Sequence, residues 1–260
     1  MATHKDLALA VAAAEAAGSL LMQHWNQRHS LTVTSKRAGD FVSEADVSSE
    51  RLLKELLIAS GSNDGWLGEE GGADACDFSR RWIVDPLDGT TNFLRGIPHW
   101  AVSIALEEHG ELVLGVVHDP TKSETFAALR GSGATLNGVP ISVSGTTDIT
   151  NALFGTGVPF GSMDHIADAA ADIAALMPMC AGVRRMGAAA LDLAYVSSGR
   201  LDGFWERKLK LWDIAAGLVL LREAGASIEG WADEDPEASG TVLCATPELF
   251  ESFATALRNK

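Results

Sequence analysis

The sequence predicts a layered fold of the α/β or α+β class. Segments with helical spacing of apolar residues alternate with short apolar runs in both halves of the chain. The chain has 260 residues, of which 47% are hydrophobic and 21% are charged, so it can bury a sizeable core. Sheets that alternate with helices along a chain are most simply covered by those helices, which gives a layered fold.

In the first half, two helices are expected before most of the strands. Residues 5–25 are rich in alanine, and leucines recur with helical spacing after Ser43. Ser43 and Asp46 have the spacing of a capping box at the start of the second helix. Strands are expected at the short apolar runs 31–34, 82–84, 101–106, 112–118 and 123–129.

The second half repeats the alternation of helices and strands. Helices are expected over residues 164–176, 188–197, 212–224 and 247–258. Strands are expected over residues 152–156, 201–205 and 241–244. The pattern changes near Pro140, which predicts an N-terminal subdomain of residues 1–142 and a C-terminal one of residues 143–260.

Charge and cysteine content narrow the function classes. Twenty Lys and Arg against 35 Asp and Glu give a net charge of −15, so the surface should repel nucleic acid and anionic membranes. No uninterrupted run of 18 apolar residues appears, which argues against a transmembrane helix. Three scattered cysteines form no disulfide framework, which favours a cytoplasmic protein. A phosphorylated substrate would then need a bound cation to attract it.

The most informative segment is residues 82–93, which reads WIVDPLDGTTNF. Its two carboxylates, Asp85 and Asp88, lie three residues apart and repel each other unless a cation lies between them. Oxygen ligands of this kind suit Mg²⁺ or Mn²⁺. The N–H groups of Gly89 and Thr90 at a helix start suit phosphate. The alternative is a turn without metal, with Asp85 as a cap and Asp88 solvated.

Other carboxylates stand at similar places in the chain. Asp46 and Asp213 lie near the starts of apolar helices, and Glu69 and Glu70 end the short apolar run 66–68. Taken singly, Asp46 is explained as a cap and Asp213 as a partner of the helix dipole. The two glutamates are explained as solvated turn residues. Four acidic segments in one chain together favour a metal site.

These segments, in this order, resemble the inositol monophosphatase family of metal-dependent, lithium-sensitive phosphomonoesterases. The matching segments are DFVSEAD (40–46), GEE (68–70), DPLDGTTNF (85–93) and WDIAAG (212–217), with support from GTGVPF (155–160) and GAAALD (187–192). They span most of the chain. The resemblance implies an αβαβα sandwich of two subdomains, of the inositol monophosphatase/fructose bisphosphatase type, which forms a homodimer.

The resemblance also implies a metal site with two or three Mg²⁺, or Mn²⁺ in their place. Its ligands would be the Leu87 carbonyl and the carboxylates of Glu69, Asp85, Asp88 and Asp213. Thr90, together with Asp46, would orient the water that attacks phosphorus. The catalytic residues would thus be Asp46, Glu70 and Thr90, with Asp46 and Glu70 either outside the ligand shell or bound to a weaker third metal. Lys36, in the loop before Asp46, is either a site residue or a solvated charge.

Substrate contacts follow from the same resemblance. They would come from Asp88, Gly89, Thr90, Ala189, Glu206 and Asp213. Gly89 and Thr90 would donate N–H groups to the phosphate, and Glu206 would accept hydrogen bonds from ring hydroxyls. The alternative for Glu206 is a salt bridge with Arg207, Lys208 or Lys210.

The implied activity is hydrolysis of a phosphate monoester, with myo-inositol monophosphate as the first candidate. A sister phosphatase for histidinol phosphate, a sugar bisphosphate or a phosphoadenosine nucleotide stays open, although residues 91–93 (TNF) resemble the inositol branch. A regulatory binding protein is a third candidate, which the intact ligand set disfavours. The chain has no HExxH, GxSxG or Walker A sequence, which argues against zinc hydrolases, serine hydrolases and P-loop NTPases.

Overall fold

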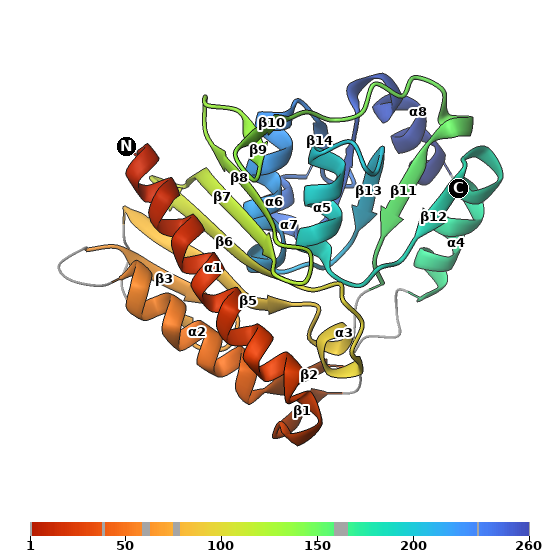
Figure 1. Cartoon of the computed structure of the whole chain (residues 1–260). Helices are drawn as coiled ribbons and strands as arrows, with labels where there is room; N and C mark the ends of the chain where they lie inside the picture. Colours follow the sequence, from red (N-terminus) through yellow and green to blue (C-terminus); the bar gives the residue numbers. More distant parts are fainter. Residues whose placement is uncertain are drawn as a thin grey trace.

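Five alternating layers of helices and sheets make up the fold (Figure 1). A computed structural model describes residues 2–37, 40–58, 63–74, 79–158, 166–232 and 234–259, without the side chains of residues 35–37, 40 and 41. The first layer is α1 (His4–Asn26) and α2 (Glu44–Leu57), and the second is an eight-stranded sheet. The third layer is α5 (Ala189–Ser197) and α6 (Leu211–Ala224), the fourth a five-stranded sheet, and the fifth α4 (Ile166–Leu176) and α8 (Pro247–Arg258). The predicted αβαβα arrangement is confirmed.

Capping boxes begin both helices of the first layer, at Thr3 for α1 and, as predicted, at Ser43 for α2. Apolar faces of α1 and α2 form one core with the large sheet. By length and composition alone, α1 is also apolar enough to cross a membrane. The absence of an uninterrupted run of 18 apolar residues was therefore too narrow a criterion for excluding a transmembrane helix. The burial of Ala10, Ala14 and Leu21 of α1 is what favours a core helix.

The large sheet places two acidic segments at one edge. Its strand order is β10 (Val139–Ile141), β9 (Ala134–Leu136), β8 (Glu124–Leu129), β7 (Glu111–Asp119), β6 (Ala101–Glu108), β5 (Arg80–Asp88), β3 (Gly65–Gly68) and β4 (Gly72–Ala73). Neighbours are antiparallel except β3 and β5, which are parallel with Gly68 opposite Val84. Because the carboxyl ends of parallel strands meet at the same edge, Glu69 lies beside the acidic end of β5.

Two glycines bring the third layer close to its neighbours. A Cβ on Gly115 of β7 would lie 2.4 Å from the Ala216 carbonyl oxygen of α6. A Cβ on Gly217 of α6 would lie 2.4 Å from Leu193 Cδ1 of α5. A larger side chain at either position would push α6 out of place. This position matters because α6 carries Asp213 in its first turn.

The fourth layer has the strand order β12 (Gly182–Arg184), β11 (Leu153–Thr156), β13 (Gly203–Glu206), β15 (Val242–Ala245) and β14 (Ser227–Glu229). The neighbours of β11 are parallel to it, and β15 is antiparallel to both of its neighbours. Phe154 of β11 stacks on Phe253 of α8 with ring centroids 4.8 Å apart. This contact joins the small sheet to the fifth layer, and Glu206 ends the central strand β13.

Shorter elements complete the chain, and several of them escaped prediction. They are the hairpin of β1 (Val33–Arg37) and β2 (Asp40–Ser43), α3 (Thr90–Arg95), α7 (Pro236–Ser239), and the 3₁₀ turns Arg28–Ser30, Ile149–Asn151 and Met177–Met179. Strands β4, β9, β10, β12 and β14 were missed, because two or three residues show no alternation. The strand expected at residues 31–34 begins only at Val33. The start expected for α4, residues 164–165, lies outside the described residues.

Candidate active site

A bulge near the end of β5 shapes the acidic segment. Asp85 pairs with Ser103 of β6, but the next paired residues are Asp88 and Ala101, so β5 carries one extra residue here. Pro86 suits this place because it has no N–H group to donate to the sheet. The Leu87 N–H donates to Asp85 Oδ1 at 2.9 Å, which closes the turn. The bulge thus lies between the two aspartates, which both stay paired with β6.

Gly89 then turns the chain from β5 into α3. Its φ of +91° lies in the left-handed region that glycine adopts without strain. A Cβ there would also lie 3.1 Å from the His99 carbonyl oxygen and 3.3 Å from Ala188 Cβ. Glycine is therefore required here both for its conformation and for the close approach of the chain around it.

The buried Asp46 and the half-buried Thr90 form a pair across 44 residues of sequence. The Thr90 Oγ1 atom lies 3.0 Å from Asp46 Oδ1 and 3.0 Å from the Leu87 carbonyl oxygen. The other oxygen of Asp46 accepts from the Ser43 N–H (2.8 Å) and the Ser43 hydroxyl (2.7 Å). Burial raises the pKa of Asp46 above its ordinary value, although these hydrogen bonds oppose the rise. One carboxylate therefore both caps α2 and contacts Thr90. The interpretation of Asp46 as a helix cap and its interpretation as a site residue do not exclude each other.

Asp88 reaches from the large sheet to the start of α5. Its Oδ2 accepts the N–H of Ala190 at 2.8 Å. The pKa of Asp88 is raised to about 7, mainly by burial and also by the Asp192 and Glu69 carboxylates, against the effect of that hydrogen bond. Burial also raises the pKa of Asp213, to about 7, and the Asp88 carboxylate adds to this rise. The Lys210 N–H, which donates to Asp213 Oδ2 at 2.6 Å, opposes it. Asp88 and Asp213, 125 residues apart, thus share one electrostatic environment.

Glu206 is a buried carboxylate that shares this electrostatic environment with Asp88 and Asp213. Only 9% of its surface is exposed, and burial together with Asp192 and Asp213 raises its pKa well above the ordinary value. The salt bridge considered with Arg207 is not formed, because Arg207 binds Asp172 of α4 instead and stacks on Trp231. Within the described residues, neither Lys208 nor Lys210 forms an ion pair with Glu206.

Glu69 and Glu70 lie in the turn between β3 and β4. The Glu69 N–H donates to the Val84 carbonyl oxygen at 3.2 Å, next to Asp85. Coulomb repulsion from Glu69, Asp88 and Asp213 adds to burial in raising the pKa of Asp85 well above its ordinary value. Ala189 lies at the first position of α5, where its N–H also contributes a hydrogen bond to Asp88.

The carboxylate cluster fits a divalent cation by the chemistry of its donors. Asp85, Asp88, Asp213 and Glu69 are hard oxygen donors. Burial and the neighbouring carboxylates raise the pKa values of the three aspartates, and a bound cation would relieve this repulsion. Among the described residues, however, no three His, Cys, Asp or Glu side chains already have the geometry of a formed metal site. The side chains are thus gathered in one region without having converged on one point.

Some contacts near the site escaped sequence reasoning. Asn92 of α3 donates to the carbonyl oxygens of His99 (2.8 Å) and Met186 (2.9 Å), which ties α3 to the segment before α5. Ser49 and Glu50 of α2 also contact the acidic segments. Their signal in the sequence was weak, because they read as ordinary polar residues of a helix. The side chain of Lys36 and residues 159–165, including part of the GTGVPF segment, lie outside the described residues.

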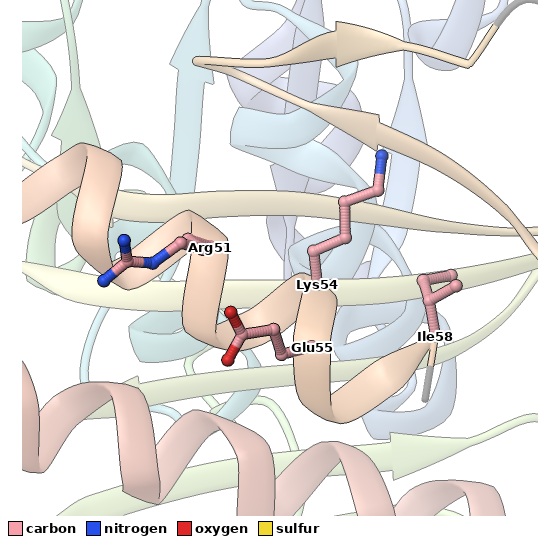
Figure 2. Close-up of a pocket in the computed structure, with 4 residues that line it drawn as sticks. All are labelled: Arg51, Lys54, Glu55 and Ile58. Carbon is pink, nitrogen blue, oxygen red and sulfur yellow. The ribbon is translucent and has the colours of Figure 1, made fainter. Parts of the chain in front are cut away.

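A shallow surface pocket lies elsewhere, on the exposed side of α2. It is lined by Arg51, Lys54, Glu55 and Ile58, and Figure 2 shows these side chains projecting from the helix. Lys54 forms an ion pair with Asp74 at 3.0 Å. None of the predicted site residues lines this pocket, so it is distinct from the carboxylate cluster.

Comparison with known proteins shows the family to which the chain belongs. The model of the inositol monophosphatase family matches residues 3–260. The chain belongs to that family. A relative in Rhizobium meliloti named "Inositol-1-monophosphatase" is 43% identical, with 99% of this chain and 96% of that protein aligned. A protein of Pseudomonas aeruginosa named "Nus factor SuhB" is 38% identical over 97% of this chain and 95% of its own length.

Solved structures show the same fold in this family. The extragenic suppressor protein suhB from Bartonella henselae has a TM-score of 0.93 and 38% identity, covering 96% of this chain and 97% of that one. The inositol monophosphatase from Anabaena has a TM-score of 0.86 and 33% identity, covering 98% and 96%. The family, the fold class and the assignment to phosphate monoester hydrolases are thereby confirmed. The roles of the individual residues stay predictions.

Proposed function

We propose that this chain hydrolyses myo-inositol monophosphate to inositol and phosphate, using two or three Mg²⁺ ions, with Mn²⁺ as a possible substitute. The observation that carries the proposal is the placement of the Asp46–Thr90 pair beside the carboxylates of β5. Two relatives more than 40% identical to the chain bear the name "Inositol-1-monophosphatase", which supports the choice of substrate. The ligands would be Glu69, Asp85, Asp88, Asp213 and the Leu87 carbonyl. Glu70 would serve a third ion.

When bound, divalent cations supply positive charge that favours hydroxide near neutral pH and stabilises the phosphoryl oxygens and the leaving alkoxide. Thr90 orients the attacking water. Its hydroxyl has one hydrogen, which it donates to Asp46 Oδ1 or to the Leu87 carbonyl oxygen, so a lone pair of Oγ1 can accept a hydrogen bond from water. The raised pKa of Asp46 suits it to receive a proton through Thr90.

The phosphate of the substrate would lie against the first turn of α3. N–H groups in the first turn of a helix have no partner within the helix, and here they belong to Thr90 and its neighbours after Gly89. The inositol ring would lie toward Glu206 and the start of α5, where Ala189 offers a backbone contact. A carboxylate accepts hydrogen bonds without donating any, so Glu206 can bind two adjacent hydroxyls. Because Arg207 is held by Asp172, it leaves Glu206 available for this role.

Replacement of Glu206 by Gln tests the substrate assignment. We expect kcat/KM for inositol monophosphate to fall about 10- to 150-fold, because hydrogen bonds to a charged group contribute about 1.5–3 kcal/mol. Turnover of p-nitrophenyl phosphate, which has no ring hydroxyls, should change less than about threefold, since such a change is under about 0.7 kcal/mol. The control is Glu251→Gln on the exposed side of α8, which should alter neither rate. Equal losses on both substrates would contradict the role of Glu206.

A regulatory role is a second candidate, because several relatives are named "Nus factor SuhB" at 36–38% identity. A pull-down from nuclease-treated lysate would test it, and a specific partner that a catalytically inactive variant retains would support it.

We further propose a cytoplasmic homodimer that binds no nucleic acid directly, with subdomains that meet near residue 142. The two described free cysteines, Cys180 and Cys244, are consistent with a reducing compartment.

A further inference from the structure

One face of α2 contacts three separate parts of the candidate site. Asp46, in the first turn, receives Thr90 from the start of α3. The Ser49 hydroxyl donates to the carbonyl oxygen of Pro86, inside the bulge of β5, at 3.0 Å. Glu50, one helical turn after Asp46, contacts the turn that follows Glu69. Residues three and four apart share a helix face, so a single rigid element joins all three parts.

The Glu50 carboxylate is bound at both of its oxygens. Oε2 accepts the N–H of Glu70 at 2.8 Å, and Oε1 accepts the N–H of Gly71 at 2.7 Å. The side chain is buried, with 7% of its surface exposed. Hydrogen bonds to an ionised acceptor are about twice as strong as neutral ones. These two contacts therefore set where the turn lies relative to α2.

Two glycines leave the space that this contact needs. A Cβ on Gly71 would lie 2.5 Å from Glu50 Oε1, and a Cβ on Gly68 would lie 2.7 Å from Glu50 Cδ. Contacts that short do not occur, so any side chain at either position would displace the carboxylate. In the GEEG sequence of residues 68–71, the glycines on either side of the Glu69–Glu70 pair thus leave room for the Glu50 carboxylate.

We propose that Glu50 is a positioning residue that fixes the Glu69–Glu70 turn against α2, and so keeps this pair in place relative to Asp46 and Thr90. The proposal rests on the proposed function in one respect, the metal-binding role of Glu69 and Glu70. The contact between Glu50 and the turn does not depend on which substrate is bound. Residues that orient metal ligands from outside the ligand shell typically contribute 10- to 100-fold to metal affinity. Glu50 acts through backbone N–H groups and touches no substrate.

Glu50→Gln is the variant that isolates this contact. Its side chain has nearly the same size, but one carboxylate oxygen is replaced by an –NH₂ group that faces an N–H donor. One hydrogen bond is lost, and the other is no longer charge-assisted. The matched control is Glu55→Gln, which makes the same change on the exposed side of α2, in the pocket of Figure 2.

The experiment measures amide hydrogen exchange of the metal-free proteins by NMR, and Mn²⁺ binding by calorimetry. For Glu50→Gln we expect exchange at Glu70 and Gly71 to accelerate at least about tenfold, while Mn²⁺ affinity falls about 10- to 100-fold. The kcat at saturating metal should fall less than the affinity does. Glu55→Gln should match the wild type in all three measurements.

Unchanged exchange at Glu70 and Gly71, or Mn²⁺ affinity within twofold of the wild type, would overturn the proposal. A loss of thermal stability with exchange raised evenly along the chain would also overturn it, because that pattern marks a purely structural role. Failure of the proposed function looks different, since the wild-type protein itself would then bind no Mn²⁺ or release no phosphate. The exchange measurement remains decisive in that case, because it requires neither metal nor substrate.

Discussion

Replacement of Asp88 by Asn should reduce kcat by about 10³-fold or more at saturating Mg²⁺. The loss of one electrostatic stabiliser of a transition state typically costs about 10²–10³-fold, and here the change also removes a proposed metal ligand. The amide keeps the size of the side chain and can still accept the N–H of Ala190. Turnover is measured as phosphate release from inositol monophosphate. A kcat near that of the wild type would show that Asp88 is not a ligand.

The stability of this variant provides the control for folding. The pKa of Asp88 is raised from 3.8 to about 7, so the folded state disfavours its ionised form. The metal-free wild type should therefore lose stability as the pH rises from about 4 through 7, while the neutral Asn at position 88 avoids this loss. We expect metal-free Asp88→Asn to be at least as stable as the wild type at pH 8, with a smaller gain on addition of Mg²⁺. Thermal unfolding with and without Mg²⁺ measures both effects.

Replacement of Thr90 by Ala should lower kcat by about 10²-fold or more, because a positioned proton-transfer group typically contributes 10²–10⁴-fold. Asp46 loses one hydrogen-bond partner but keeps both contacts from Ser43, so the start of α2 should stay intact. KM should change less than kcat, since the N–H groups at the start of α3 survive. Steady-state kinetics on inositol monophosphate separate the two parameters.

Two conservative variants accompany this prediction. Thr90→Ser keeps the hydroxyl and should retain most of the activity. Thr91→Ala removes a hydroxyl from the next residue of α3 and should change kcat little, because no described hydrogen bond of the Thr91 side chain reaches Asp46. A raised KM with unchanged kcat in Thr90→Ala would contradict the water-orienting role and make Thr90 a binding residue.

Sequence reasoning found the long elements because their periodicity is strong. The bounds of α8 were predicted to the residue, those of α1 and α6 to within one residue, and the start of α2 to within one residue. It also found the capping box of α2, since Ser43 and Asp46 have a fixed local spacing. The strand β12 and the hairpin of β9 and β10 were missed, because three residues cannot display a period of two.

The candidate site was predictable where chemistry is encoded locally and unpredictable where it depends on tertiary contacts. The acidic pair of β5 could be identified from residues 85–88 alone. The placement of Asp213 beside Asp88 depends on how α6 packs, and it became an expectation only through the family resemblance. Glu50 had no local signal, because both of its partners are backbone N–H groups about 20 residues away.

The central claim is that a divalent cation held by this carboxylate cluster drives phosphate monoester hydrolysis. The most direct measurement is phosphate release from a panel of phosphate monoesters, including inositol monophosphate, after exhaustive dialysis against EDTA and then after addition of Mg²⁺. The account predicts no turnover in the metal-free protein, recovery with Mg²⁺, and the highest kcat/KM for inositol monophosphate. Full activity in protein shown by mass spectrometry to contain no metal would contradict it.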